Sequence, residues 1–184
     1  MSIRPDLLAV LPQLVADQVR VWLPHLATCK GVVGRIDLAE VKRLGIQAPA
    51  VLVSRFGARI DRTHAGPHRQ YLIDMAAFVL TKNVIGLDRN DAASAITQAL
   101  LAQLPDMDLA VEGVGEASEV AEHSLITTDV QKEGIALWAV TFRLRVALAG
   151  FPEAPPITPQ LYVGWAPEIG AAHEADYELV GGQT

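Results

Sequence analysis

The chain has 184 residues, 51% of them hydrophobic, and its 15 Lys and Arg against 21 Asp and Glu leave a net charge of −6. This length suits one domain with appendages better than two full domains. The acidic balance argues against nucleic-acid binding as the main role, which needs a basic surface, and leaves open a local basic patch. The longest apolar runs, Met75 to Leu80 and Ile135 to Val140, are far below the roughly 18 residues of a membrane span. We expect a soluble protein whose surplus apolar surface is covered by other copies of itself.

Cysteine usage and the first residues point to a reducing compartment. Cys29 is the only cysteine, so it forms no internal disulfide and no zinc site, which fits the cytoplasm. Arg4, Pro5 and Asp6 stand where the apolar part of a signal peptide would begin, so none is expected.

The first elements expected along the chain are helical. Apolar residues recur every three or four positions from Leu7 to Leu23, which predicts an amphipathic helix with Pro5 in its first turn. Pro12 lies inside this pattern and is expected to bend or restart the helix. A capping-box-like start at Asp37 predicts a short helix through about Leu44.

Two strands and another helix follow. Ala50 to Phe56 and Gln70 to Lys82 are rich in β-formers, and we expect a hairpin whose long, basic loop spans Gly57 to Arg69. Asn90 or Asp91 is the expected cap of a helix that ends before Pro105.

The C-terminal half returns to strand. Met107 to Val114 and Glu119 to Thr127 are weaker strand candidates, because Gly113 and Gly115 interrupt them. From Ile135 to Val146 a long strand is predicted, with one face buried along its whole length. That face carries Trp138, Val140, Phe142, Leu144 and Val146, whereas the other changes from Ile135, Leu137 and Ala139 to Thr141, Arg143 and Arg145. The second face is therefore expected to start covered and to end in contact with water or a partner.

The composition changes again at Gly150. Five prolines between Pro152 and Pro167 exclude helix and central strand. Phe151, Tyr162 and Trp165 are too apolar for a solvated tail, so we expect them to anchor an extended arm on a neighbouring subunit or partner. The predicted fold is α+β, a mostly antiparallel sheet flanked by amphipathic helices over residues 1–149, with an extended Pro-rich C-terminal arm over residues 150–184.

The search for chemistry yields no catalytic constellation. His64 and His68 are four apart, but Gly66 and Pro67 between them favour exposed loop histidines over a metal site. Asp61 and Asp74 could be imagined as paired carboxylates, although Asp74 in an apolar strand is more simply explained by a positive charge facing it.

Glycines and nucleophile candidates also lack the context of a site. Gly31, Gly34, Gly113 and Gly115 match neither a dinucleotide-binding fingerprint nor a P-loop and are expected in turns and bulges. No nucleophile elbow surrounds Ser54 or Ser124, and no base is assigned to Cys29. We therefore expect no enzyme activity, no metal and no cofactor.

One cluster of basic residues is a candidate interaction surface. Arginines and histidines surround the hairpin loop, and two more arginines share one face of the long strand. A solvated loop and an electrostatic contact with an acidic partner surface or with passing DNA stay open as explanations. The arginines concerned are Arg55, Arg59, Arg62, Arg69, Arg143 and Arg145.

The order of these elements resembles the Mu-type, or Gp37-like, phage tail terminator family. The resemblance covers roughly residues 5 to 150 and is carried by the N-terminal helix, the basic hairpin loop and four segments. These are PAVLVSRFG from Pro49, YLIDMAAFVLTKN from Tyr71, DAASAITQALLAQL from Asp91 and LWAVTFRLRV from Leu137.

The resemblance implies a structural protein of the virion tail, assembled in the host cytoplasm. Its copies would form a homohexameric ring at the head-proximal end of the tail tube, stop tube polymerisation and dock the head-side connector or stopper protein. DNA would be a partner only in passage through the ring, and no membrane is involved. The alternatives are a small α+β hydrolase or ligand-binding enzyme whose site converges only in three dimensions, and another head-tail connector subunit.

Overall fold

The structure is a computed structural model that divides into two compact units, Met1–Gly150 and Phe151–Thr184. In the second unit the short strands β6 (Leu161–Val163) and β7 (Glu178–Val180) pair antiparallel. Phe151, Trp165 and the side chain of Tyr162 lie outside the described residues, so the arm stays a prediction. The structure describes residues 3–34, 43, 45–63, 69–83, 85–125, 134–148, 161–163 and 178–180.

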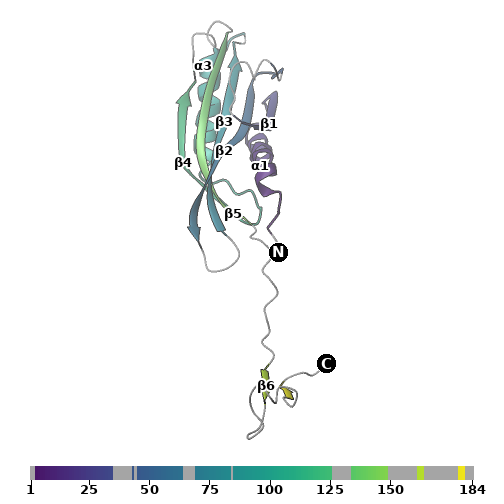
Figure 1. Cartoon of the computed structure of the whole chain (residues 1–184). Coiled ribbons are helices and arrows are strands. Elements are labelled where there is room, and N and C mark those ends of the chain that lie inside the picture. The colour runs from purple at the N-terminus through teal and green to yellow at the C-terminus, as the bar shows by residue number, and fades with distance from the viewer. Residues whose placement is uncertain are drawn as a thin grey trace. The chain divides into compact units, whose positions relative to one another are not determined.

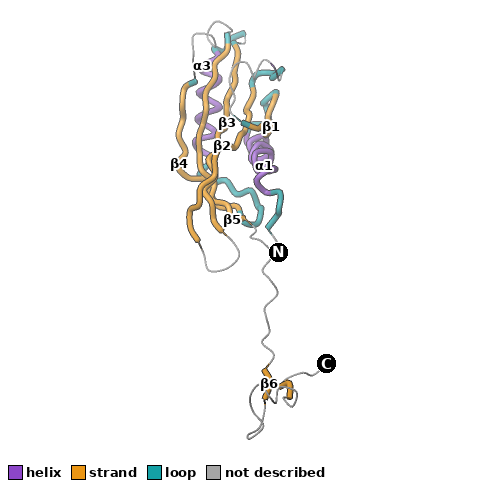
Figure 2. Tube along the Cα trace, viewed as in Figure 1, coloured by secondary structure: helices purple, strands orange, loops and turns teal. Residues whose placement is uncertain are grey.

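The first unit is a five-stranded sheet with two helices on one face (Figures 1 and 2). The strand order is β1-β2-β3-β5-β4, in which only the β1–β2 pair is parallel. This confirms the predicted α+β class with a mostly antiparallel sheet. Among the described residues no helix is long and apolar enough to cross a membrane. The elements are α1 (Leu7–Trp22), β1 (Thr28–Val33), β2 (Ala50–Thr63), β3 (Arg69–Lys82), α3 (Arg89–Gln103), β4 (Val114–Ser124) and β5 (Ile135–Leu148).

The two faces of β5 differ in burial as predicted. Its even-numbered residues face α1 and α3, and Val140, Phe142 and Leu144 are buried in the main core there. We call this side the helix face and the opposite side the outer face. On the outer face Ile135, Leu137 and Ala139 join a smaller buried cluster with Ile46, Leu52 and Phe78, whereas Thr141 and Arg143 are half-buried and Arg145 is exposed.

The glycine at position 31 lies inside a strand that the sequence analysis did not predict. A Cβ on Gly31 would stand 2.5 Å from the backbone nitrogen of Gln13, so β1 approaches α1 more closely than any other residue would allow. The interpretation of Gly31 as a turn residue was therefore wrong, whereas Gly34 and Gly113 do have positive φ angles, of 82° and 85°. α1 continues through the buried Pro12 without a break.

Side chains of α1 bind the free edge of β1. The Gly31 N–H donates to Gln13 Oε1 at 2.9 Å, and Arg20 Nη2 donates to the Cys29 carbonyl at 3.1 Å. The Cys29 thiol in turn donates to the Ala16 carbonyl at 3.1 Å. Outward backbone groups of this edge strand are thus already hydrogen-bonded within the chain.

Three expected boundaries were wrong. β2 continues through Gly57 to Thr63, because bulges at Arg55/Gly57 and Ile60/Arg62 keep it paired with β3. The predicted long loop is therefore shorter and comprises residues 64–68, which lie outside the described residues. The cap of α3 is Asp88, whose carboxylate accepts from Asn90 N at 2.7 Å. Residues 107–113 form no strand, and β4 begins at Val114. The helix expected from Asp37 to Leu44 falls almost wholly outside the described residues.

Gly31→Ala should destabilise the first unit by about 1 to 3 kcal/mol, because the added methyl group forces backbone of α1 and β1 apart. Gly115→Ala is the matched control, since it lies in the other edge strand and its Cβ would meet no atom closer than 3.4 Å. Urea unfolding of both variants measures the difference. Equal stability of the two variants would contradict the close contact.

Candidate interaction surface

Strand alternation, together with the bulge after Arg55, divides the predicted arginine cluster between the two faces of the sheet. Arg59, Arg143 and Arg145 point to the outer face, where they contact carboxylates of the same face. Arg55 lies opposite the fully buried Met75, and Arg69 lies opposite Leu148 of the helix face, so the pairing register places both on the other side. The expectation of one basic cluster around the loop was therefore wrong in its geometry. The Arg62 side chain lies outside the described residues.

An ion-pair network crosses four strands on the outer face. Arg143 Nε of β5 binds Asp74 Oδ1 of β3 at 2.9 Å, and the same guanidinium contacts Glu119 of β4. Arg59 Nη1 of β2 lies 3.7 Å from the same Asp74 oxygen. Asp74 does face positive charge, as the sequence analysis expected. Because Arg143 and Asp74 side chains are only 27% and 26% exposed, their contact is less screened by water than a surface pair.

A second ion pair lies on the same face. Arg145 Nε binds Asp61 Oδ2 at 2.8 Å, and the Asp61 side chain is 16% exposed. Asp61 and Asp74 are bound by different arginines, so they do not form a carboxylate pair. With Arg59, Arg143 and Glu119 these ion-paired residues comprise three cations and three anions, so their charges are satisfied by contacts between strands.

Glu119 is a member of this network that sequence reasoning missed. It has a φ angle of 51° and lies in the bulge where the pairing shifts between Ser118 and Ala121. Such a φ is uncommon for a residue other than glycine. The bulge turns the Glu119 carboxylate toward Arg143, and no glycine or asparagine in the sequence marks the place.

Two shallow hollows lie side by side on the outer face and share Phe56 and Thr141. Small residues leave the space between larger neighbours, and Phe56 is 48% exposed at the margin. The first, about 280 Å³, is mainly apolar, and the second, about 330 Å³, contains the Arg143 network. Their linings are Phe56, Ala76, Phe78, His123, Leu125, Ala139 and Thr141 for the first and Phe56, Asp74, Glu119, Ala121, Thr141, Phe142 and Arg143 for the second.

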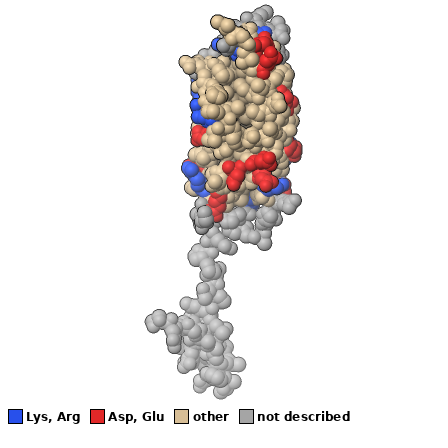
Figure 3. Space-filling view, turned by 180° about the vertical axis from the view of Figure 1, so that it is seen from behind, with Lys and Arg blue, Asp and Glu red and all other residues tan. Residues whose placement is uncertain are grey.

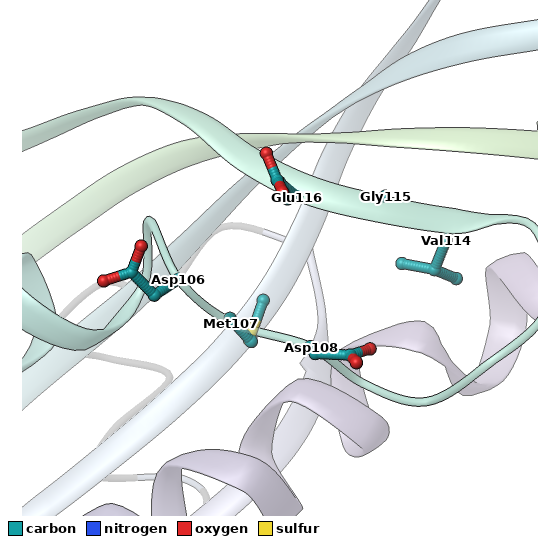
Figure 4. Close-up of a pocket in the computed structure, with 6 residues that line it drawn as sticks. All are labelled: Asp106, Met107, Asp108, Val114, Gly115 and Glu116. Carbon is teal, nitrogen blue, oxygen red and sulfur yellow. The ribbon is translucent and has the colours of Figure 1, made fainter.

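A third hollow, of about 370 Å³, is lined by Asp106, Met107, Asp108 and the start of β4. Figure 4 shows that the carboxylates of Asp106, Asp108 and Glu116 point in different directions and do not converge. Asp108 instead accepts from the Ala110 N–H at 2.8 Å. No group of three or more His, Cys, Asp or Glu among the described residues could hold a metal ion.

The nucleophile candidates take part in structural contacts. Ser54 is fully buried, and its hydroxyl donates to the Gly34 carbonyl. Burial raises the pKa of the Cys29 thiol to about 11, with Arg20 opposing the shift and Asp17 adding to it, so the thiol is neutral at pH 7. Ser124 lies exposed at the end of β4, whereas His64 and His68 fall outside the described residues.

Comparisons of the chain with models of known protein families and with curated proteins gave no match.

Arg143→Met should lower the free energy of unfolding by about 1 to 2 kcal/mol, because it leaves two carboxylates without their shared cation. Arg4→Ala is the control, since the exposed Arg4–Asp6 pair should contribute nothing measurable. Urea unfolding and a double-mutant cycle with Asp74→Asn measure the coupling. Additive effects of Arg143→Met and Asp74→Asn would contradict the network.

The Cys29 thiol should make stability fall at alkaline pH. Its pKa is about 11 in the folded chain and 9.0 in the reference state, so above about pH 9 the unfolded chain loses a proton that the folded chain keeps. This contribution is present below pH 9 and is lost as the pH rises to about 11. The difference in unfolding free energy between the parent and Cys29→Ala should therefore shrink over that range, and a pH-independent difference would exclude the burial effect.

Proposed function

We propose that this chain is a phage or prophage tail terminator, whose copies form a hexameric ring on the finished tail tube. The observation that carries the proposal is the order of elements in one sheet. α1, β2, β3, α3 and β5 follow one another in the order that the resemblance implies, and both helices cover one face.

The character of the outer face supports a role in assembly. The half-buried Arg143 and Asp74 and the buried Ser54 and Cys29 all take part in contacts within the fold. The remaining outer surface offers shallow hollows beside the half-exposed Phe56. Aromatic residues beside arginines are frequent at the centres of protein interfaces.

A ring explains termination by simple occlusion. Tube subunits add to the exposed end of the last tube layer, and a closed ring bound there covers the surface that the next layer would use. The upper side of the ring then presents a new surface to the head-side connector or stopper protein. DNA passes through the ring as cargo, and the proposal assigns the chain no cofactor and no catalytic step.

A phage that lacks this chain should make tails that exceed the normal length and carry no heads. Negative-stain electron microscopy of lysates measures both effects, and the parental chain supplied from a plasmid should restore normal tails. As a control, a capsid-gene deletion should leave tail length unchanged. Normal tail length without the chain, or its absence from purified tails by mass spectrometry, would exclude the proposal.

A further inference from the structure

The charges of the first unit are distributed unevenly along the chain. The described residues of α1 and β1 hold Arg20 and Lys30 against Asp17, whereas residues 104–125 hold six Asp and Glu and no Lys or Arg. The strand order separates these segments, because β1 and β2 lie at one side of the sheet and β4 forms the opposite edge. The unit is therefore electrically polar across the width of its sheet.

The acidic side is an exposed surface that we call the β4 edge. All its carboxylates are exposed, and among the described residues only Glu119 has a cation partner, Arg143. In Figure 3 Asp and Glu side chains lie along the side that carries β4 and in a band near the lower end of the body. The β4 edge consists of Asp106, Asp108, Glu112, Glu116, Glu119 and Glu122.

The opposite side is formed by α1 and β1, and we call it the α1–β1 edge. It carries the cations Arg20 and Lys30 and exposed aliphatic side chains. Val33 is 96% exposed and Val21 is 73% exposed. Arg20 is exposed on α1 and Lys30 is half-buried on β1, and the acid of this edge, Asp17, accepts a hydrogen bond from Gln13 Nε2 at 2.7 Å. In Figure 3 Lys and Arg side chains appear on the side that carries α1.

Neither edge is suited to extending the sheet into another copy. The Gln13 and Arg20 side chains bind outward backbone groups of β1, and two bulges interrupt β4 at Val114/Ala117 and Ser118/Ala121. Both devices are known to prevent strands of different molecules from pairing. A contact between copies at these edges therefore has to be made by side chains.

We propose that the β4 edge of one copy docks on the α1–β1 edge of the next copy. This rests on the ring of the proposed function and identifies its seam. A ring needs a head-to-tail contact between two different surfaces of each subunit, and these two surfaces lie on opposite sides and have opposite charge. Val21 and Val33 supply apolar area, and the carboxylates around Glu116 and Glu122 face Arg20 and Lys30.

Charge reversal of one edge at a time tests the seam. Glu116→Lys/Glu122→Lys should weaken self-association about tenfold or more, and so should Lys30→Glu/Val33→Glu. An equimolar mixture of the two variants should associate again, because copies can alternate around an even-numbered ring with opposite charges at every seam. Sedimentation velocity of the full chain at low and high salt measures this, and salt should weaken the parental association.

Ser94→Lys/Gln98→Lys is the control, because it adds positive charge at two exposed positions of α3, which belongs to neither edge. Unfolding midpoints establish that each variant folds, and a variant that does not is replaced by Glu122→Lys or Val33→Glu alone. A parental chain that stays monomeric at low salt, reversals that associate normally, or a mixture that does not recover would overturn the seam. If the chain is present on tails and both reversals leave its rings there intact, the seam is refuted and the terminator function stands. If the reversals behave as expected in solution but the chain is absent from purified tails, the terminator function is refuted and the seam stands.

Discussion

The fold depends on the different environments that the two faces of β5 require. This strand is hydrogen-bonded to β3 on one side and to β4 on the other, so its side chains can point only to the helix face or the outer face. On the first face the apolar side chains of Val140, Phe142 and Leu144 are shielded from water by α1 and α3. On the second face the change from Leu137 to Arg143 divides the surface into a buried cluster and a charged region. The positions of the helices and of the ion pairs both follow from this one strand.

α1 has a second role besides covering the core. It lies so close to β1 that only glycine fits at position 31, and its Gln13 and Arg20 side chains then reach backbone groups of that strand. The helix therefore closes one edge of the sheet, while bulges and carboxylates disturb the other edge at β4. Both features hinder unspecific pairing of these edges with strands of other molecules.

Sequence reasoning succeeded where a pattern repeats over many residues and failed where a structure depends on distant contacts. The spacing of Leu7 to Leu23 and the alternation in β5 are long enough to indicate helix and strand. β1 has only six residues, including Lys30 and Gly31, so its pattern is too short to recognise. Arg143 and Asp74 are 69 positions apart, and only the strand register brings them together. The bulge between Arg55 and Gly57 turns Arg55 and Arg59 to opposite faces, although residues four apart in a regular strand share one face.

The division of the chain after Gly150 also divides its charge. Residues 1–150 contain all 15 Lys and Arg and 16 of the 21 Asp and Glu, whereas residues 151–184 contain five Asp and Glu and no cation. The folded body is therefore almost isoelectric, and the net repulsion between free copies comes mostly from the last 34 residues. Bodies without net charge tend to associate or precipitate at high concentration. We therefore expect the charge of the C-terminal unit to favour solubility of the chain.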